Sequence, residues 1–146
     1  MSNDKTSALK TLHTRMHDSI DGYEAARERT ESAFVKGMID EMLADRRSDM
    51  MKVHGFLTAM GENEEHTGSA LGSVHQSFLK LKDMVTGSGD EAVLQEIVRG
   101  EEHLLEAYND ALEATGAGDA EYAELNQQYS KLKGKIEQFR QRAQAA

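Results

Sequence analysis

Residues 90–114 read DEAVLQEIVRGEEHLLEAYNDALEA, and this stretch decides the fold class. Its apolar residues recur at intervals of three, four or seven: Leu94, Ile97, Leu104, Tyr108 and Leu112. Such spacing places them along one face of an α-helix and leaves the opposite face polar. Asp90, which follows a glycine, is suited to cap the first turn. The stretch therefore predicts a long amphipathic helix.

The same periodicity recurs in four other segments, and none of them alternates in the manner of a β-strand. These segments span residues 7–29, 32–60, 69–85 and 119–142. The glycine-bearing stretches ENEEHTGS, TGSGD and TGAGD mark three of the turns between them. The chain of 146 residues has no proline, where an average chain of this length holds roughly seven. Because proline breaks helix interiors, its absence also favours long helices.

These elements predict a single all-α domain over residues 1–146, with an ordered core from about 7 to 142. Four long helices suit a four-helix bundle. The shorter segment, 69–85, falls between the second and third long helices, where a crossover connection would make those two helices parallel. An up-down bundle with a fifth packed helix is the alternative.

Composition and charge exclude several functional classes. The chain has no cysteine, which removes disulfides, zinc–thiolate sites and cysteine nucleophiles. No apolar run is long enough to span a membrane, and no signal peptide precedes the polar start MSNDKTS. The chain is acidic, with a net charge of −9, which argues against nucleic acid as a partner. We therefore expect a cytoplasmic protein with neither a membrane nor a nucleic-acid partner.

Two charged residues interrupt apolar helix faces. Arg46 lies in the middle of the stripe formed by Met42 and Val53, and Glu101 lies between Ile97 and Leu104. A buried unpaired charge is costly, so each needs a partner. The simplest prediction is that the guanidinium of Arg46 pairs with the carboxylate of Glu101.

Other polar residues lie near these two positions. We predict a polar cluster in the core with these members: Tyr23, Glu24, Arg46, Asp49, Glu101, Tyr108 and Tyr129. One interpretation is a buried ion-pair network that sets the helix register. The other is a metal or small-ligand site in the bundle core.

Histidines supply the second candidate site. His13 and His17 are four residues apart on one helix, as in metal-binding histidine pairs. Their flank lies beside the apolar stripe, so a surface pair is the expectation. A single divalent metal bound by Glu24, Glu101 and one of these histidines is the alternative.

Four short motifs occur in order along the chain: Asp21-Gly22-Tyr23, Arg46-Arg47, Gly68-Ser69 and Arg99-Gly100-Glu101. With this layout the chain resembles a bacterial family of uncharacterised ferritin-like four-helix-bundle proteins, a domain of unknown function. The resemblance covers about residues 9–139 and implies a crossover between the second and third long helices. It implies no established activity.

The ferritin-like resemblance raises the question of a di-metal centre. Such centres use a Glu-x-x-His pair on two of the helices, and this sequence has no such pair. Arg46 lies where a ligand would be needed, and its charge would repel a cation. We therefore predict no full di-iron centre.

Three functions remain open from the sequence. The first is a non-enzymatic bundle that acts by association, as a homo-oligomer, and needs no cofactor. The second is a ferritin-like protein with an altered, incomplete metal site. The third is a module that binds a small anionic ligand near Arg46. We favour the first, because no nucleophile and base are arranged in a recognised order.

Overall fold

The computed structural model describes residues 2–62, 80–81, 83–85, 87 and 89–145. It contains four long α-helices, and no described residue lies in a β-strand. The helices are α1 (Ser2–Arg29), α2 (Ala33–Ala59), α4 (Asp90–Ala114) and α5 (Ala120–Ala145). The predicted all-α bundle is therefore confirmed. None of these helices is apolar over a length that could cross a bilayer.

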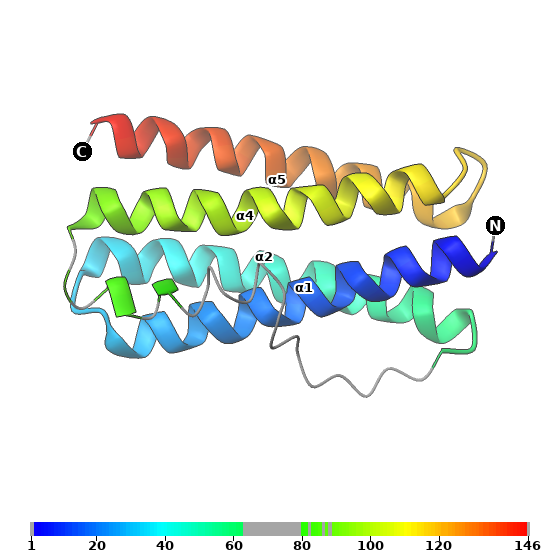
Figure 1. Ribbon diagram of the computed structural model, residues 1–146, viewed down its shortest axis with the longest axis horizontal. Coiled ribbons are helices and arrows are strands. Elements are labelled where there is room, and N and C mark those ends of the chain that lie inside the picture. Colours follow the sequence, from blue (N-terminus) through cyan, green and yellow to red (C-terminus); the bar gives the residue numbers. More distant parts are fainter. Residues whose placement is uncertain (1, 63–79, 82, 86, 88, 146) are drawn as a thin grey trace.

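The second and third long helices, α2 and α4, run in the same direction (Figure 1). Both begin at one end of the bundle, where the Ser32 hydroxyl lies 3.3 Å from an Asp90 carboxylate oxygen. At the other end, the Thr6 hydroxyl near the start of α1 lies 3.7 Å from the sulfur of Met60, just beyond the end of α2. The parallel orientation predicted for a crossover bundle is therefore present.

The predicted crossover helix lies mostly outside the described residues. Of the range 69–85, Lys80, Leu81, Asp83 and Met84 are helical, whereas residues 69–79 and 82 are not described. Arg29 at the end of α1 donates to Asp83 at 3.2 Å. This contact places the last part of the connection beside the end of α1.

Neighbouring helices around the bundle run antiparallel. α1 packs closely on α2 and on α4, and α4 packs closely on α5. Long side chains bridge α2 and α5, including Lys131, whose ammonium lies 2.9 Å from Asp49. The parallel pair α2 and α4 lies on a diagonal of the bundle. Antiparallel neighbours set opposite ends of the helix dipoles side by side, which is favourable.

Three of the helix ends follow the turn chemistry of the sequence. Ser32 caps α2, because its hydroxyl accepts the backbone N–H of Val35 at 3.2 Å. The turn after α2 uses Gly61, whose φ of +84° suits only glycine well. α4 starts at Asp90, as predicted, but Asp90 is not its cap: the N-cap residue is Gly89, and Asp90 lies in the first turn of the helix.

The predicted bounds of the outer helices are too short. α1 starts at Ser2 rather than at residue 7, and α5 runs to Ala145 rather than to 142. The first turns of α1 are tied to the start of α5, because the Lys5 ammonium lies 3.1 Å from Glu121 in the first turn of α5 and 3.6 Å from Asp119 just before it. These contacts extend the helix beyond its apolar stripe.

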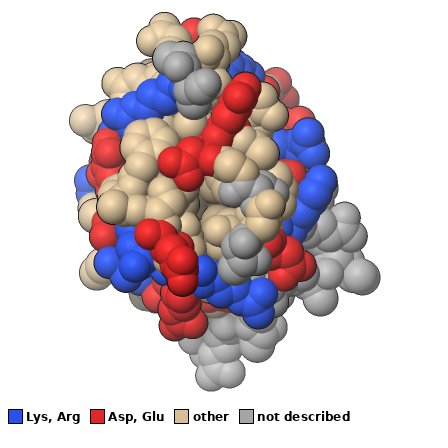
Figure 2. Space-filling view, turned by 90° about the vertical axis from the view of Figure 1, so that its left-hand side faces the viewer, with Lys and Arg blue, Asp and Glu red and all other residues tan. Residues whose placement is uncertain are grey.

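One end of the bundle carries mixed charge. Figure 2 looks onto the end where α2 and α4 begin, and lysine or arginine side chains there are interspersed with acidic ones and with uncharged residues. Neither sign forms a continuous patch on this face. The charged residues that remain as candidates for a functional site are therefore the few that are buried in the core.

The core is formed by apolar residues from all four helices, with the rings of Tyr23, Tyr108 and Phe139 as its largest members. Several polar side chains are buried with them. They are His13, Asp18, Ser19, Thr30, Arg46, Asp49, Glu96, Glu101, Thr115 and Gln128. Because buried polar groups need hydrogen-bond partners, these residues are where a site would be sought.

Candidate functional site

Glu101 lies at the centre of the polar core. Its carboxylate projects from the middle of α4, and the residue has 0% of its surface exposed. The Tyr23 hydroxyl of α1 donates to Oε1 at 2.8 Å. Arg46 of α2 donates from Nη1 to Oε1 at 3.1 Å and from Nη2 to Oε2. The carboxylate thus accepts three hydrogen bonds from two neighbouring helices.

Arg46 is bound in turn by a residue that the sequence reasoning missed. Its Nη1 also donates to the Ser19 hydroxyl of α1 at 2.7 Å, and that hydroxyl donates to the backbone carbonyl of Met16 at 2.7 Å. Ser19 follows Met16 by three residues and precedes Tyr23 by four, so helical spacing could have placed it on the core face. The resulting layer joins α1, α2 and α4.

A second polar layer is centred on Gln128 of α5. The Tyr108 hydroxyl of α4 donates to Gln128 Oε1 at 2.8 Å. Gln128 Nε2 donates to the backbone carbonyl of Asp49 on α2 at 3.4 Å and to the Glu124 carboxylate at 2.8 Å. This layer joins α2, α4 and α5. Together the two layers link all four long helices.

Asp49 lies near the pair of charges but has its own partner. Its carboxylate accepts a hydrogen bond from the Lys131 ammonium at 2.9 Å. Burial raises the pKa of Asp49, and the charge of Lys131 opposes that rise. Asp49 therefore belongs to the seam between α2 and α5 and gives no hydrogen-bonding group to Arg46.

The protonation states follow from burial and pairing. Burial raises the pKa of Tyr23 well above its ordinary value, and the negative charge of Glu101 raises it further. Burial alone would lower the pKa of Arg46, but the charge of Glu101 and the hydrogen bonds to it outweigh that effect and raise it. Tyr23 therefore stays a neutral donor and Arg46 stays a cation.

Two predicted members lie outside the cluster. Glu24 is exposed and pairs with Arg47 at 2.7 Å, because one residue beyond Tyr23 the helix has turned by about 100°. Tyr129 is half-buried at the outer side of α5, with the Lys133 ammonium 5.9 Å from its ring centre. Glu24 belongs to the surface of the bundle, and Tyr129 packs against the edge of the apolar core.

The predicted surface histidine pair is also corrected. His13 is buried, and its ring centre lies 5.5 Å from that of His54 on α2, so that it fills the seam between α1 and α2. His17 is half-buried, with Nδ1 3.3 Å from the Asp21 carboxylate. Although they are four residues apart on one helix, the two histidines therefore lie in different surroundings.

The residues do not fit the metal site that a ferritin-like resemblance implies. Arg46 occupies both oxygens of Glu101, and Glu24 faces solvent. Ser19 is the residue of α1 that accepts from Arg46. His13 lies six residues before it, which is about 9 Å along the helix from the Arg46–Glu101 layer. Among the residues that the structure describes, no three histidine, aspartate or glutamate side chains gather closely enough to hold a metal ion.

A small cavity opens beside Arg46 between α2 and α5. Its volume is about 10 Å³, and Arg46, Asp49, Tyr108 and Lys131 line it. That is room for about one water molecule. A substrate of several heavy atoms does not fit there.

Comparison with known families matches residues 4–114 to a model described as a domain of unknown function, DUF2383. The chain belongs to this family. The match includes α1, α2 and α4, and thus Ser19, Tyr23, Arg46 and Glu101, and it ends where α4 ends. The resemblance expected over residues 9–139 therefore extends less far toward the C-terminus. No curated protein and no solved structure matches the chain.

Proposed function

We propose that this DUF2383 chain is a ferritin-like helical bundle without a catalytic centre, which acts by association with another copy of itself. The Arg46–Glu101 pair sets the register of its helices. The parallel pair α2 and α4 supports the ferritin-like part of the proposal, since bundles with one crossover place helices in this way.

The observation that carries the proposal is that the charges in the core bind each other. Glu101 accepts from Arg46 and Tyr23, and Arg46 also donates to Ser19. Arg46 and Glu101 have 3% and 0% of their surface exposed. A catalytic acid, base or ligand-binding cation must touch its substrate. The surface of the bundle is therefore the better place for activity.

The test is to replace the buried pair as a unit. We expect Arg46→Met or Glu101→Leu alone to lower the free energy of unfolding by about 3–5 kcal/mol, because each leaves an unpaired buried charge. The double variant should recover most of that loss. Urea unfolding followed by circular dichroism measures all three.

The exposed pair Arg47 and Glu24 is a matched control, since Arg47 follows Arg46 on α2 and its ion pair with Glu24 joins α2 to α1 at the surface. Arg47→Met with Glu24→Leu should change stability by less than about 1 kcal/mol. Elemental analysis of the purified wild type decides against the proposal if it finds stoichiometric iron, manganese or zinc that Glu101→Leu removes. Such a result would establish a metal-binding function instead.

A further inference from the structure

A groove made of two adjoining hollows, which share Glu102 and Leu105, lies on the outer face of α4 and α5. One part has a volume of about 440 Å³ and is lined by Leu105, Gly134 and Ile136, among others. A second part of about 300 Å³ shares Leu105 and continues toward Tyr129. Leu105 and Tyr129 are half-buried. The face thus combines a long hollow with apolar side chains in its floor.

The hollow is lined in part by a glycine inside a helix. Gly134 lies in the interior of α5 and is exposed, and a Cβ atom there would meet nothing within 4 Å. A glycine inside a helix is unfavourable relative to alanine. Among the residues that the structure describes, none lies against this Cβ position, so the helix backbone at Gly134 is open to a molecule that approaches α5 from outside.

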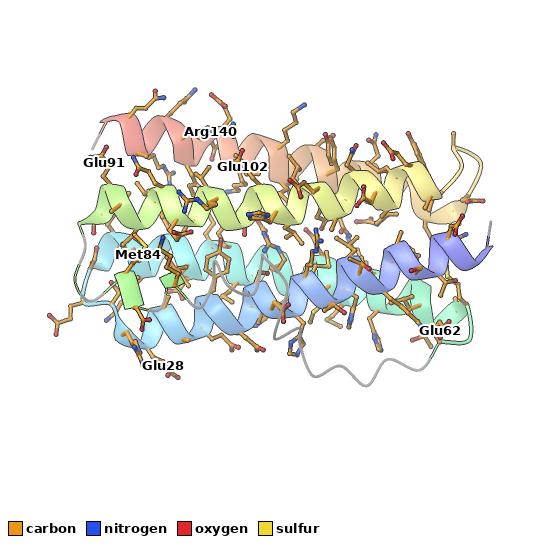
Figure 3. All side chains as sticks on the ribbon, viewed as in Figure 1. Glu28, Glu62, Met84, Glu91, Glu102 and Arg140 are labelled. Carbon is orange, nitrogen blue, oxygen red and sulfur yellow. The ribbon has the colours of Figure 1, made fainter. Side chains whose placement is uncertain are left out.

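The two helices present opposite charges along this face. α4 carries Glu102 and Glu106, and α5 carries Lys133 and Arg140, with Glu137 as an acidic exception. Within one chain Glu102 accepts from Arg140, and Figure 3 shows the two labelled side chains reaching toward each other. An acidic row therefore lies beside a basic row.

We infer that this α4–α5 face is the surface on which a second copy of the chain docks, which rests on the proposed function of association. α4 and α5 are antiparallel neighbours. A two-fold axis parallel to them therefore places α4 of one copy against α5 of the other at the same height. Glu102 and Glu106 of one copy then face Arg140 and Lys133 of the second copy. An isologous interface requires this kind of self-complementarity.

The dimensions of the face agree with a stable dimer. α4 has 25 residues and α5 has 26, so each is about 38 Å long. With interaxial distances of 8–10 Å, two such helices present roughly 700 Å². Stable interfaces bury about 800 Å² on each partner.

Two charge-reversal variants test the inference. The first carries Glu102→Lys and Glu106→Lys, and the second carries Lys133→Glu and Arg140→Glu. In a dimer of either variant alone, like charges oppose each other, so its dissociation constant should rise about 100-fold. When the two variants are mixed, opposite charges face each other again, and a heterodimer should form. Analytical ultracentrifugation of each variant and of the mixture measures this.

Rescue by mixing separates contact between copies from the pair within one chain, because mixing cannot repair Glu102 and Arg140 of the same chain. The inference is overturned if the wild type is monomeric across micromolar concentrations, which would leave the groove to a different partner. It is equally overturned if both variants remain dimers.

Gly134 provides a second measurement that does not depend on charge. The Cβ of Gly134→Leu would meet open space, so the leucine should enter the groove and weaken the dimer at least tenfold while the chain keeps its helicity. Gly37→Leu is the matched control, because Gly37 is also exposed inside a helix with open space around its Cβ position. Equal dissociation constants for the two variants would contradict the inference. A wild-type dimer that persists in the charge-reversal variants and in Gly134→Leu would overturn this face and leave the proposed association standing, whereas a monomeric wild type would overturn both.

Discussion

The hydroxyl of Tyr23 should stabilise the fold more than that of Tyr108, although both are buried. Tyr23 donates to the carboxylate of Glu101, whereas Tyr108 donates to the neutral amide of Gln128. Hydrogen bonds to charged groups contribute about 1.5–3 kcal/mol and neutral ones about 1 kcal/mol. We expect Tyr23→Phe and Tyr108→Phe to lower the free energy of unfolding in that order. Tyr129→Phe, at a half-buried position, is the control and should be near neutral.

Urea unfolding of these three variants provides the measurement. A loss for Tyr108→Phe that exceeds the loss for Tyr23→Phe would contradict the ranking. It would mean that the Gln128 layer, and not the charged layer, dominates the polar core.

Sequence reasoning locates Arg46 and Glu101 because each interrupts an apolar stripe near the middle of a long helix. At that distance from the helix ends, errors in helix bounds do not change which face a residue occupies. The pairing then follows from the cost of a buried charge, without knowledge of the topology.

The same reasoning fails for residues at the edge of a stripe. Glu24 and Tyr129 each lie at a boundary between the core face and the solvent face of a helix. Whether such a side chain is buried depends on where the neighbouring helix lies. His13 is buried by α2, whose position beside α1 is a tertiary fact. Periodicity along one helix cannot supply such information.

At the level of single helices, the start of α4 can be improved. Its N-cap is Gly89, which offers no side-chain acceptor, although its φ of −72° and ψ of 165° suit any residue. A Cβ there would meet nothing within 4 Å. We expect Gly89→Ser to raise the free energy of unfolding by about 0.5–1 kcal/mol, through a cap hydrogen bond and reduced freedom of the unfolded chain.

Gly61 provides the opposite case for comparison. Its φ is +84°, so Gly61→Ala should destabilise the chain by about 1 kcal/mol, although the Cβ position is open. Thermal unfolding of both variants measures the effect. A gain of stability at Gly61, or a loss at Gly89, would contradict the assigned backbone geometry.

The helix bounds show how far local signals reach. α4 runs over the predicted 90–114, because glycine clusters and an acidic first residue mark its start and glycine follows its end. α1 begins earlier than predicted, and Lys5 in its first turns forms ion pairs with Asp119 and Glu121 at the start of α5. Those partners are distant in sequence, so no local pattern announces them.

At the level of the whole molecule, the family match and the folded unit differ. The match ends at residue 114, but α5 supplies Leu125, Leu132, Ile136 and Phe139 to the core. A chain truncated after residue 116 would expose the apolar face of α4. We therefore expect it to lose cooperative unfolding and to bind a hydrophobic dye, as measured by circular dichroism and fluorescence.

The matching control for the truncation is the full chain with Phe139→Ala, which keeps α5 but removes its largest core ring. It should unfold cooperatively with a free energy lower by about 3–5 kcal/mol. If the truncated chain unfolds as cooperatively as this variant, α5 is an addition to a bundle that is complete without it.

The arrangement of the helices could be predicted only as a pair of alternatives. Helix lengths and turns suit both a crossover and an up-down bundle, since both bury the same stripes. What distinguishes them is the end at which α4 begins, and contacts such as Ser32 with Asp90 reveal that only in three dimensions. The fold class could therefore be predicted from the sequence, whereas the order and direction of the helices in the bundle required the structure.

The burial of Arg46 has a further consequence for observing the protein. Its guanidinium hydrogens that bind Glu101 and Ser19 are enclosed by α1, α2 and α4, so they can exchange with heavy water only when those helices separate. Exposed arginines exchange these hydrogens quickly. One slowly exchanging side chain would thus report the opening of the entire bundle, and its protection factor would measure that free energy directly.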